Sequence, residues 1–167
     1  DDPTHSLEHH QAIANDPTID IRVYPTFRPD AALGVDDARH FNSYADKLSE
    51  VSGVDCSNLS GFCDAIRARH NFFHELGGRL SDHGLHHLYD AECSQKKAET
   101  IFDKVRAGTN ADAAQTEAFG AYLMLFFGEL DASHGWTKQL HIGCERNNNR
   151  RLFEKLGRDI GCDSMAD

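Results

Sequence analysis

The sequence contains no long apolar run and no excess of positive charge. Its longest apolar stretch is the seven residues 121–127, whereas a membrane-spanning helix needs about 20. Lysine and arginine number 17 against 27 aspartates and glutamates, which gives a formal net charge of −10. Because a broad nucleic-acid surface needs a basic face, we expect neither a membrane nor a nucleic acid as partner.

The sequence also lacks the marks of secretion. The opening Asp1-Asp2-Pro3 has neither the basic region nor the apolar core of a secretory signal. The cysteines are odd in number and form no Cys-x-x-Cys pair, unlike a secreted disulfide framework. We therefore expect a cytoplasmic protein whose five thiols are reduced, namely those of Cys56, Cys63, Cys93, Cys144 and Cys162.

Several motifs of common chemistry are missing. There is no glycine-rich phosphate loop, no Gly-x-Ser-x-Gly and no zinc-type spacing of cysteine and histidine. His70 and His74 lie four residues apart, but the glutamate of a His-Glu-x-x-His zinc motif is absent. The pairs His9-His10 and His86-His87 would diverge by roughly 100° on a helix. We interpret all of these histidines as structural.

The composition is that of a globular domain, with 40% hydrophobic and 26% charged residues. The length suits one domain with a substantial core. Apolar residues spaced three and four apart predict amphipathic helices. The predicted helices cover residues 4–15, 36–52, 58–76, 94–107 and 112–134, with a short last helix after the polar loop 145–151.

Three short segments between these helices favour strands. Residues 19–23 and 136–142 alternate apolar with polar side chains, and 79–84 is a shorter candidate. In 136–142, Leu140 and Ile142 point one way, while Thr137, Gln139 and His141 point the other. Strands that alternate with helices, without hairpin signals, predict a parallel sheet of βα units.

A strand with one polar side is typical of a barrel whose polar side chains reach into its mouth. A closed eight-stranded barrel has about 250 residues, which exceeds the 167 present. The sequence therefore indicates either a smaller open α/β domain or an internal part of a larger barrel.

Arg28 is the first candidate site residue, because it follows the predicted strand 19–23. Active sites of barrels and open α/β sheets gather at the carboxyl ends of strands. A guanidinium there could hold a substrate carboxylate through two parallel hydrogen bonds. The alternative is a surface arginine that pairs with Asp30.

Two histidines have similar positions. His141 ends the clearest strand on its polar side, where an imidazole could act as a general acid or base; it could equally be a core histidine. His83 belongs to Ser81-Asp82-His83-Gly84, where Asp82 could orient it or it could point into the site. These contiguous residues cannot converge as a hydrolase triad does.

Arg146 opens the polar segment Arg146-Asn147-Asn148-Asn149-Arg150 directly after the His141 strand. Such a loop could line a site for a polyhydroxy substrate. Asparagine is also a common turn former, so both interpretations stay open.

The order of several motifs resembles the uronate isomerase (glucuronate isomerase) family of the amidohydrolase superfamily. The resemblance extends along essentially the whole chain. The most specific motifs are Arg28-Pro29-Asp30, Ser81-Asp82-His83-Gly84 and Leu140-His141-Ile142-Gly143 with Arg146-Asn147-Asn148-Asn149. They are accompanied by Asp1-Asp2-Pro3, Ser6-Leu7-Glu8-His9-His10, Arg69-His70-Asn71-Phe72-Phe73-His74, Gly78-Arg79-Leu80, Gly135-Trp136 and Asp163-Ser164.

This resemblance implies one segment, residues 1–167, of a distorted (β/α)8 TIM-type barrel, covering about strands 4 to 6. It implies reversible aldose–ketose isomerisation of D-glucuronate to D-fructuronate, and of D-galacturonate to D-tagaturonate, in hexuronate catabolism. By the same resemblance Arg28 and His141 are active-site positions, and Arg146 and His83 are substrate-binding positions. A homo-oligomer is possible.

The resemblance further implies a divalent metal, often zinc, held mainly by a His-x-His pair and a strand-end aspartate. No His-x-His occurs here, so the metal ligands are expected outside this segment and the isolated chain is expected to be inactive. Two alternatives are another metal-dependent hydrolase of the amidohydrolase type and a non-catalytic metal-binding module.

Overall fold

A computed structural model describes residues 1–157, 160–161 and 163–165. The expected thiol of Cys162 lies outside these residues. The helices are α1 (Glu8–Asn15), α2 (Ala38–Ser52), α3 (Leu59–Glu75), α4 (Gln95–Arg106), α5 (Ala113–His134) and α6 (Arg150–Leu156), with a 3₁₀ helix η1 (Asp30–Leu33). The strands are β1 (Leu80–Leu85), β2 (Thr137–Ile142), β3 (Cys144–Glu145) and β4 (Ser164–Met165).

The four long helices confirm the sequence prediction, and each begins at a polar capping residue. The side chains of Asp37, Asn58, Ser94 and Asp112 accept hydrogen bonds from backbone N–H groups that have no partner within the helix. α1 starts four residues later than predicted, at Glu8. The caps therefore explain why α2 to α5 were readable from sequence.

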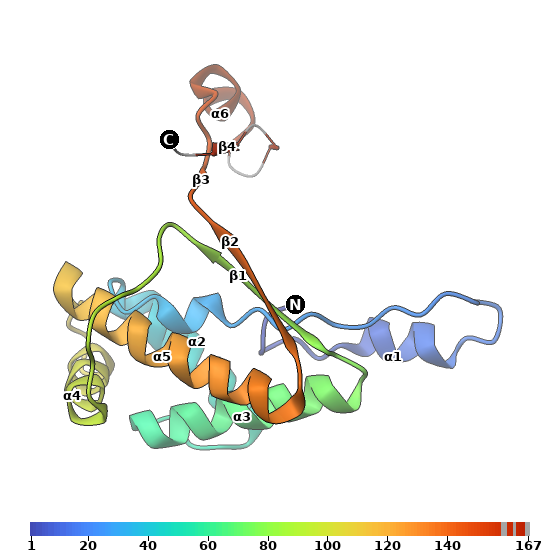
Figure 1. The fold of residues 1–167 in the computed structure, drawn as a ribbon, viewed down its shortest axis with the longest axis horizontal. Coiled ribbons are helices and arrows are strands. Elements are labelled where there is room, and N and C mark those ends of the chain that lie inside the picture. The colour runs from blue at the N-terminus through green and yellow to red at the C-terminus, as the bar shows by residue number, and fades with distance from the viewer. Residues whose placement is uncertain (158–159, 162, 166–167) are drawn as a thin grey trace.

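These four helices form one layer that encloses the main core (Figure 1). Phe41, Phe62 and Phe102 are completely buried and lie within 6 Å of one another, ring centre to ring centre. Aromatic contacts of this kind add to the hydrophobic free energy of burial. The strands β1 and β2 cross this layer diagonally, while α1 and the loop after it project away from the layer (Figure 1).

β1 and β2 pair in parallel, with Leu80 opposite Thr137 and Leu85 opposite Ile142. A single parallel bridge joins Phe27 to Ser81 on the other side of β1. The predicted strand at 19–23 is wrong. These residues have no ladder partner, and Ile21 is 72% exposed. An alternating segment forms a strand only where a neighbouring strand supplies hydrogen bonds. Here the pairing with β1 begins at Phe27.

The C-terminal part lies beyond the end of β2, away from the helical layer (Figure 1). β3 and β4 form a two-residue antiparallel pair there, with Cys144 opposite Met165. The loop predicted at 145–151 is confirmed for residues 146–149, whereas Glu145 belongs to β3 and α6 begins at Arg150. The β3–β4 pair was not predicted, because two-residue strands have no periodicity to detect.

The fold is mixed α/β, as expected, with a parallel β1–β2 pair covered on one side by helices. Over the described ranges, no helix is both long and apolar enough to cross a membrane. Cys56, Cys63, Cys93 and Cys144 are free thiols, as predicted. Burial raises the pKa of Cys63 to about 12 and that of Cys56 to about 11, which suits inert core cysteines.

Candidate active site

The two faces of β1 have different surroundings. Side chains alternate along a strand, so Ser81, His83 and Leu85 point into the protein and are at most 5% exposed. Asp82 and Gly84 point the other way. The register places Asp82 beside Gln139 and Gly84 beside His141, so one face of the β1–β2 pair is open and polar.

Asp82 links the two principal candidates on this open face. One of its carboxylate oxygens lies 3.3 Å from Nη1 of Arg28, and the other lies 2.7 Å from Nδ1 of His141. The Arg28 and His141 side chains are 42% and 53% exposed, whereas Asp82 is 15% exposed. A guanidinium and an imidazole thus reach the same face from two segments 113 positions apart, both accessible to a solute.

Arg28 is held on its other side by Asp30. Its Nε donates to Oδ2 of Asp30 at 3.1 Å, so the contact with Asp30 that the sequence suggested does form. The guanidinium also passes directly over Gly84, where any Cβ would overlap Nη2 of Arg28. Glycine at position 84 therefore leaves room for the arginine.

Asp30 collects three donors. Besides Arg28, the backbone N–H of Gly84 donates to Oδ2 at 2.8 Å, and Nδ1 of His83 lies 2.9 Å from Oδ1. Burial by itself raises the pKa of this carboxyl, but the interaction with His83 and the hydrogen bonds from Gly84 and Arg28 outweigh it. The net pKa is lowered, so Asp30 is ionised at neutral pH.

His83 faces away from the open side. It is fully buried, and its ring stacks on Phe127 with the centres 5.7 Å apart. Its second ring nitrogen, Nε2, lies 3.1 Å from Nζ of Lys138 on β2. Both nitrogens of His83 are thus engaged by protein groups.

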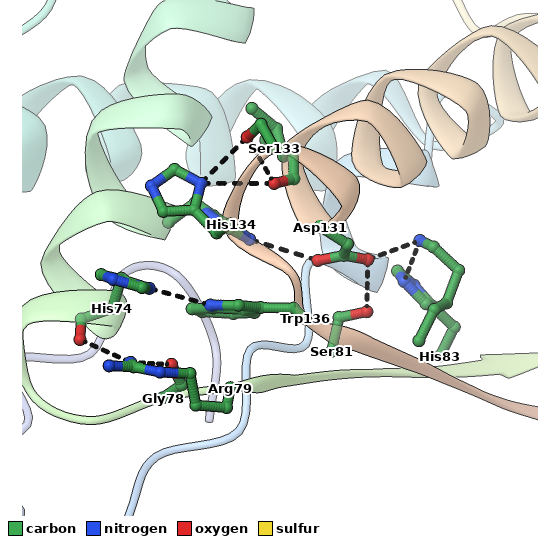
Figure 2. Close-up of polar contacts among 12 residues, drawn as sticks. His74, Gly78, Arg79, Ser81, His83, Asp131, Ser133, His134 and Trp136 are labelled. Carbon is green, nitrogen blue, oxygen red and sulfur yellow. Dashed lines mark hydrogen bonds and ion pairs between the residues drawn. The ribbon is translucent and has the colours of Figure 1, made fainter.

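Asp131, near the end of α5, completes the buried side (Figure 2). Its carboxylate accepts a hydrogen bond from Ser81 Oγ at 2.7 Å and lies 3.1 Å from Nζ of Lys138 and 3.2 Å from Nε2 of His70. Burial raises the pKa of Asp131, but these three partners lower it further than burial raises it. The helix α5 is thereby tied to α3 and to both strands.

The histidines at 70 and 74 are structural, as interpreted from sequence. His70 is fully buried and stacks on Trp136 with ring centres 3.9 Å apart. Nε1 of Trp136 donates to Nδ1 of His74 at 3.0 Å (Figure 2). These rings pack α3 against the start of β2.

Arg146 lies in the C-terminal part, away from the Asp82 contacts. Its Nη1 donates to Asp163 at 2.8 Å, and Asn148 bonds to Ser164 nearby. The loop lines a shallow cavity of about 490 Å³ together with His86. The structure therefore brings Arg28 and His141 together but leaves Arg146 on a separate segment.

A larger hollow lies at the carboxyl end of β1. It has a volume of about 580 Å³ and is bordered by Asp30, Gly84, His86, His87 and Glu117, among others. Nε2 of His87 lies 2.7 Å from Glu117. This position beside the end of a parallel strand is where α/β proteins commonly bind ligands.

A metal centre needs several converging ligands. In the part of the chain that the structure describes, no three histidine, cysteine, aspartate or glutamate side chains are grouped to hold an ion. The described residues therefore do not fit a complete metal site, and the expectation that its ligands lie elsewhere stays a prediction.

The model of the glucuronate isomerase family matches residues 1–167. This chain belongs to the glucuronate isomerase family. A uronate isomerase from Solibacter usitatus is 48% identical over 167 residues, and one from Opitutus terrae is 46% identical. Each match covers all of this chain, but only 36% and 35% of the relative.

Solved structures of this family agree with the fold. Uronate isomerase from Thermotoga maritima superposes with a TM-score of 0.87 at 33% identity, covering all of this chain and 37% of that one. Glucuronate isomerase from Caulobacter crescentus gives 0.85 at 29% identity, covering 34% of that chain. The chain thus spans about a third of the length of its relatives.

The sequence analysis gave no role to Lys138 and Asp131, which contact the buried side chains of His83 and Ser81. Lys138 was visible as a lysine on the apolar side of its strand, between Trp136 and Leu140, and a charge there signals a buried partner. Asp131 had no comparable signal. Asp82 was considered only as a partner of His83, but it contacts Arg28 and His141 instead, because neighbouring side chains on a strand point to opposite faces.

Proposed function

We propose that the full-length protein containing this chain is a uronate isomerase that interconverts D-glucuronate with D-fructuronate, and D-galacturonate with D-tagaturonate. Family membership supports the reaction class. The observation that carries the assignment to this segment is the convergence of Arg28 and His141 on Asp82.

Arg28 would bind the substrate carboxylate. Its guanidinium is planar and always charged, so it can donate two parallel hydrogen bonds to a carboxylate. Nε already donates to Asp30 at 3.1 Å, which leaves Nη1 and Nη2 as the pair of donors for a substrate carboxylate. A hexuronate would then compete with Asp82 for Nη1.

His141 would carry protons between oxygens of the sugar. Ring opening moves the proton of the anomeric hydroxyl to the ring oxygen, and isomerisation then breaks the C2–H bond and forms a C1–H bond. The O2 proton is transferred to O1, so atoms and electrons balance without a further reactant. An imidazole suits these transfers near neutral pH, and Asp82, 2.7 Å away, would hold the ring in place.

We further propose that residues 1–167 form one segment of a (β/α)8 barrel. The segment at Phe27, β1 and β2 would be three successive neighbouring strands of that barrel. The order Phe27–β1–β2, parallel throughout, supports this. Its remaining strands, and the ligands of a divalent metal such as zinc, would come from outside the chain. Arg146 would join the substrate site through the C-terminal part.

Isomerase assays on the full-length protein test this function. We expect conversion of D-glucuronate or D-galacturonate to the matching ketose, and a loss of at least 100-fold in kcat for His141→Gln, since general acid–base catalysis contributes about 10²–10⁴. The control is His40→Gln, which replaces an exposed histidine of α2 and should retain normal kcat. No turnover of either hexuronate by the unmodified protein would refute the proposal.

A further inference from the structure

The buried face of β1 carries a row of alternating donors and acceptors that ends at Arg28. The row consists of Asp131, Lys138, His83, Asp30 and Arg28, with contacts of 3.1, 3.1, 2.9 and 3.1 Å in that order. Every link joins two different elements or loops, and the ring at its centre is completely buried. The chemistry of its members fixes where the protons lie.

The tautomer of His83 follows from its two partners. The carboxylate of Asp30 can only accept, so Nδ1 of His83 must carry a hydrogen. The ammonium of Lys138 can only donate, so Nε2 must be bare. His83 is therefore neutral and protonated on Nδ1 alone. The charge of Lys138 is balanced by Asp131, at 3.1 Å.

Asp30 is the link between this buried row and the open face. Its Oδ1 faces His83 while Oδ2 takes Nε of Arg28 and the backbone N–H of Gly84. With both oxygens occupied, the carboxylate cannot rotate without losing a hydrogen bond. The guanidinium of Arg28 therefore has one favoured orientation, with Nη1 3.3 Å from Asp82 and Nη2 over Gly84.

We propose that His83 is a positioning residue, held as the Nδ1–H tautomer by Lys138, and that it orients Arg28 for the substrate carboxylate through Asp30. This proposal rests on the proposed function of Arg28. It replaces the expectation that His83 itself contacts the substrate. A ring with both nitrogens engaged and no exposed surface has no group left for a sugar.

The first test needs no substrate. In the full-length protein labelled with ¹⁵N-histidine, His83 is assigned by the signal that disappears in His83→Gln. We expect the Nδ1–H, bare-Nε2 pattern in the unmodified protein and in Lys138→Arg, which keeps a donor. Lys138→Met should alter the Nε2 shift. A ring of residue 83 that is protonated on Nε2 in the unmodified protein would overturn the proposal.

The second test separates positioning from folding. Lys138→Met and the charge-balanced Lys138→Met/Asp131→Asn pair should raise KM for a hexuronate about five- to tenfold, with kcat changed less than twofold, and Lys138→Arg should recover most of the loss. Lys96→Met, an exposed lysine of α4, is the control. Unchanged KM in both Met variants, with the Nε2 shift altered, would show that the row does not orient Arg28.

These outcomes stay distinct from failure of the proposed function. If Arg28→Lys leaves KM unchanged, Arg28 does not bind the carboxylate, and the kinetic half of the proposal falls with it. The tautomer of His83 is measured without turnover, so its result stands or falls independently.

Discussion

The two faces of the β1–β2 pair carry similar polar residues in different surroundings. On the buried face, Lys138 lies between Asp131 and His83, and Ser81 and His83 of β1 are at most 1% exposed. On the open face, an arginine, an aspartate and a histidine meet with two of the three about half exposed. Polar groups that are closed off stabilise the fold, and those that stay accessible can bind a substrate.

This comparison predicts that loss of a charge partner reduces stability more on the buried face than on the open face. Replacement of Asp131 by alanine leaves the ammonium of Lys138 without its counter-charge and should reduce the free energy of unfolding by about 3 kcal/mol. Urea unfolding of the full-length protein measures this loss. Asp82→Ala on the open face serves as the comparison and should cost less than about 1 kcal/mol. Equal losses would remove the distinction between the faces.

On the open face the largest effect is expected at Arg28. Arg28→Lys keeps the charge but loses the planar pair of donors. We expect kcat/KM for hexuronates to fall about 10- to 100-fold, or about 1.4–2.7 kcal/mol, mostly through a higher KM, with unfolding unchanged. Steady-state kinetics with both hexuronates test this, and Arg39→Lys on the exposed side of α2 is the matched control.

A smaller effect should follow from Gly84→Ala, which disturbs the open face without removing a functional group. The new methyl group would overlap Nη2 of Arg28, and the flexible end of the arginine can move aside. We expect KM to rise about threefold to tenfold, or about 0.7–1.4 kcal/mol, while kcat changes little. An unaltered KM would mean that the position of Nη2 over Gly84 is not needed for binding.

The mildest effect is expected from acid. The pKa values of Asp30 and Asp131 are lowered in the folded protein by their hydrogen-bond donors, relative to an ordinary value of 3.8. Their contribution to stability is therefore fully present above that value and lost as the pH falls through the lowered folded pKa. Asp131→Asn should flatten the decline in unfolding free energy below about pH 4. A decline as steep as in the unmodified protein would assign the acid sensitivity to other groups.

The sequence predicted the helices well and the strands less well. Capping residues such as Asp112 and apolar spacing along 112–134 act locally, so they can be read without neighbours. The segment 19–23 alternates apolar and polar side chains as β2 does, yet only β2 pairs with a neighbouring strand. Pairing depends on segments distant in sequence, and alternation alone does not contain that information.

The candidate site shows the same division. His141 was selected because it stands near the end of β2, and family motifs surround both candidates. Arg28 was selected because it follows the segment 19–23, although that segment does not form a strand. The role of Asp82 was misplaced, because its partner was sought next to it in sequence rather than across the sheet. Lys138 and Asp131 were missed as a pair, since residues 131 and 138 belong to two different elements.

The sequence alone determined the four long helices and the type of group that could bind a carboxylate, because both depend on local chemistry. It also predicted the free thiols. Only the tertiary structure decided which imidazole is accessible and which is locked, because that depends on the face of each strand that the helices cover. His141 and His83 are the same side chain, one 53% exposed and the other fully buried. The packing of α5 against one face of β1 makes that difference.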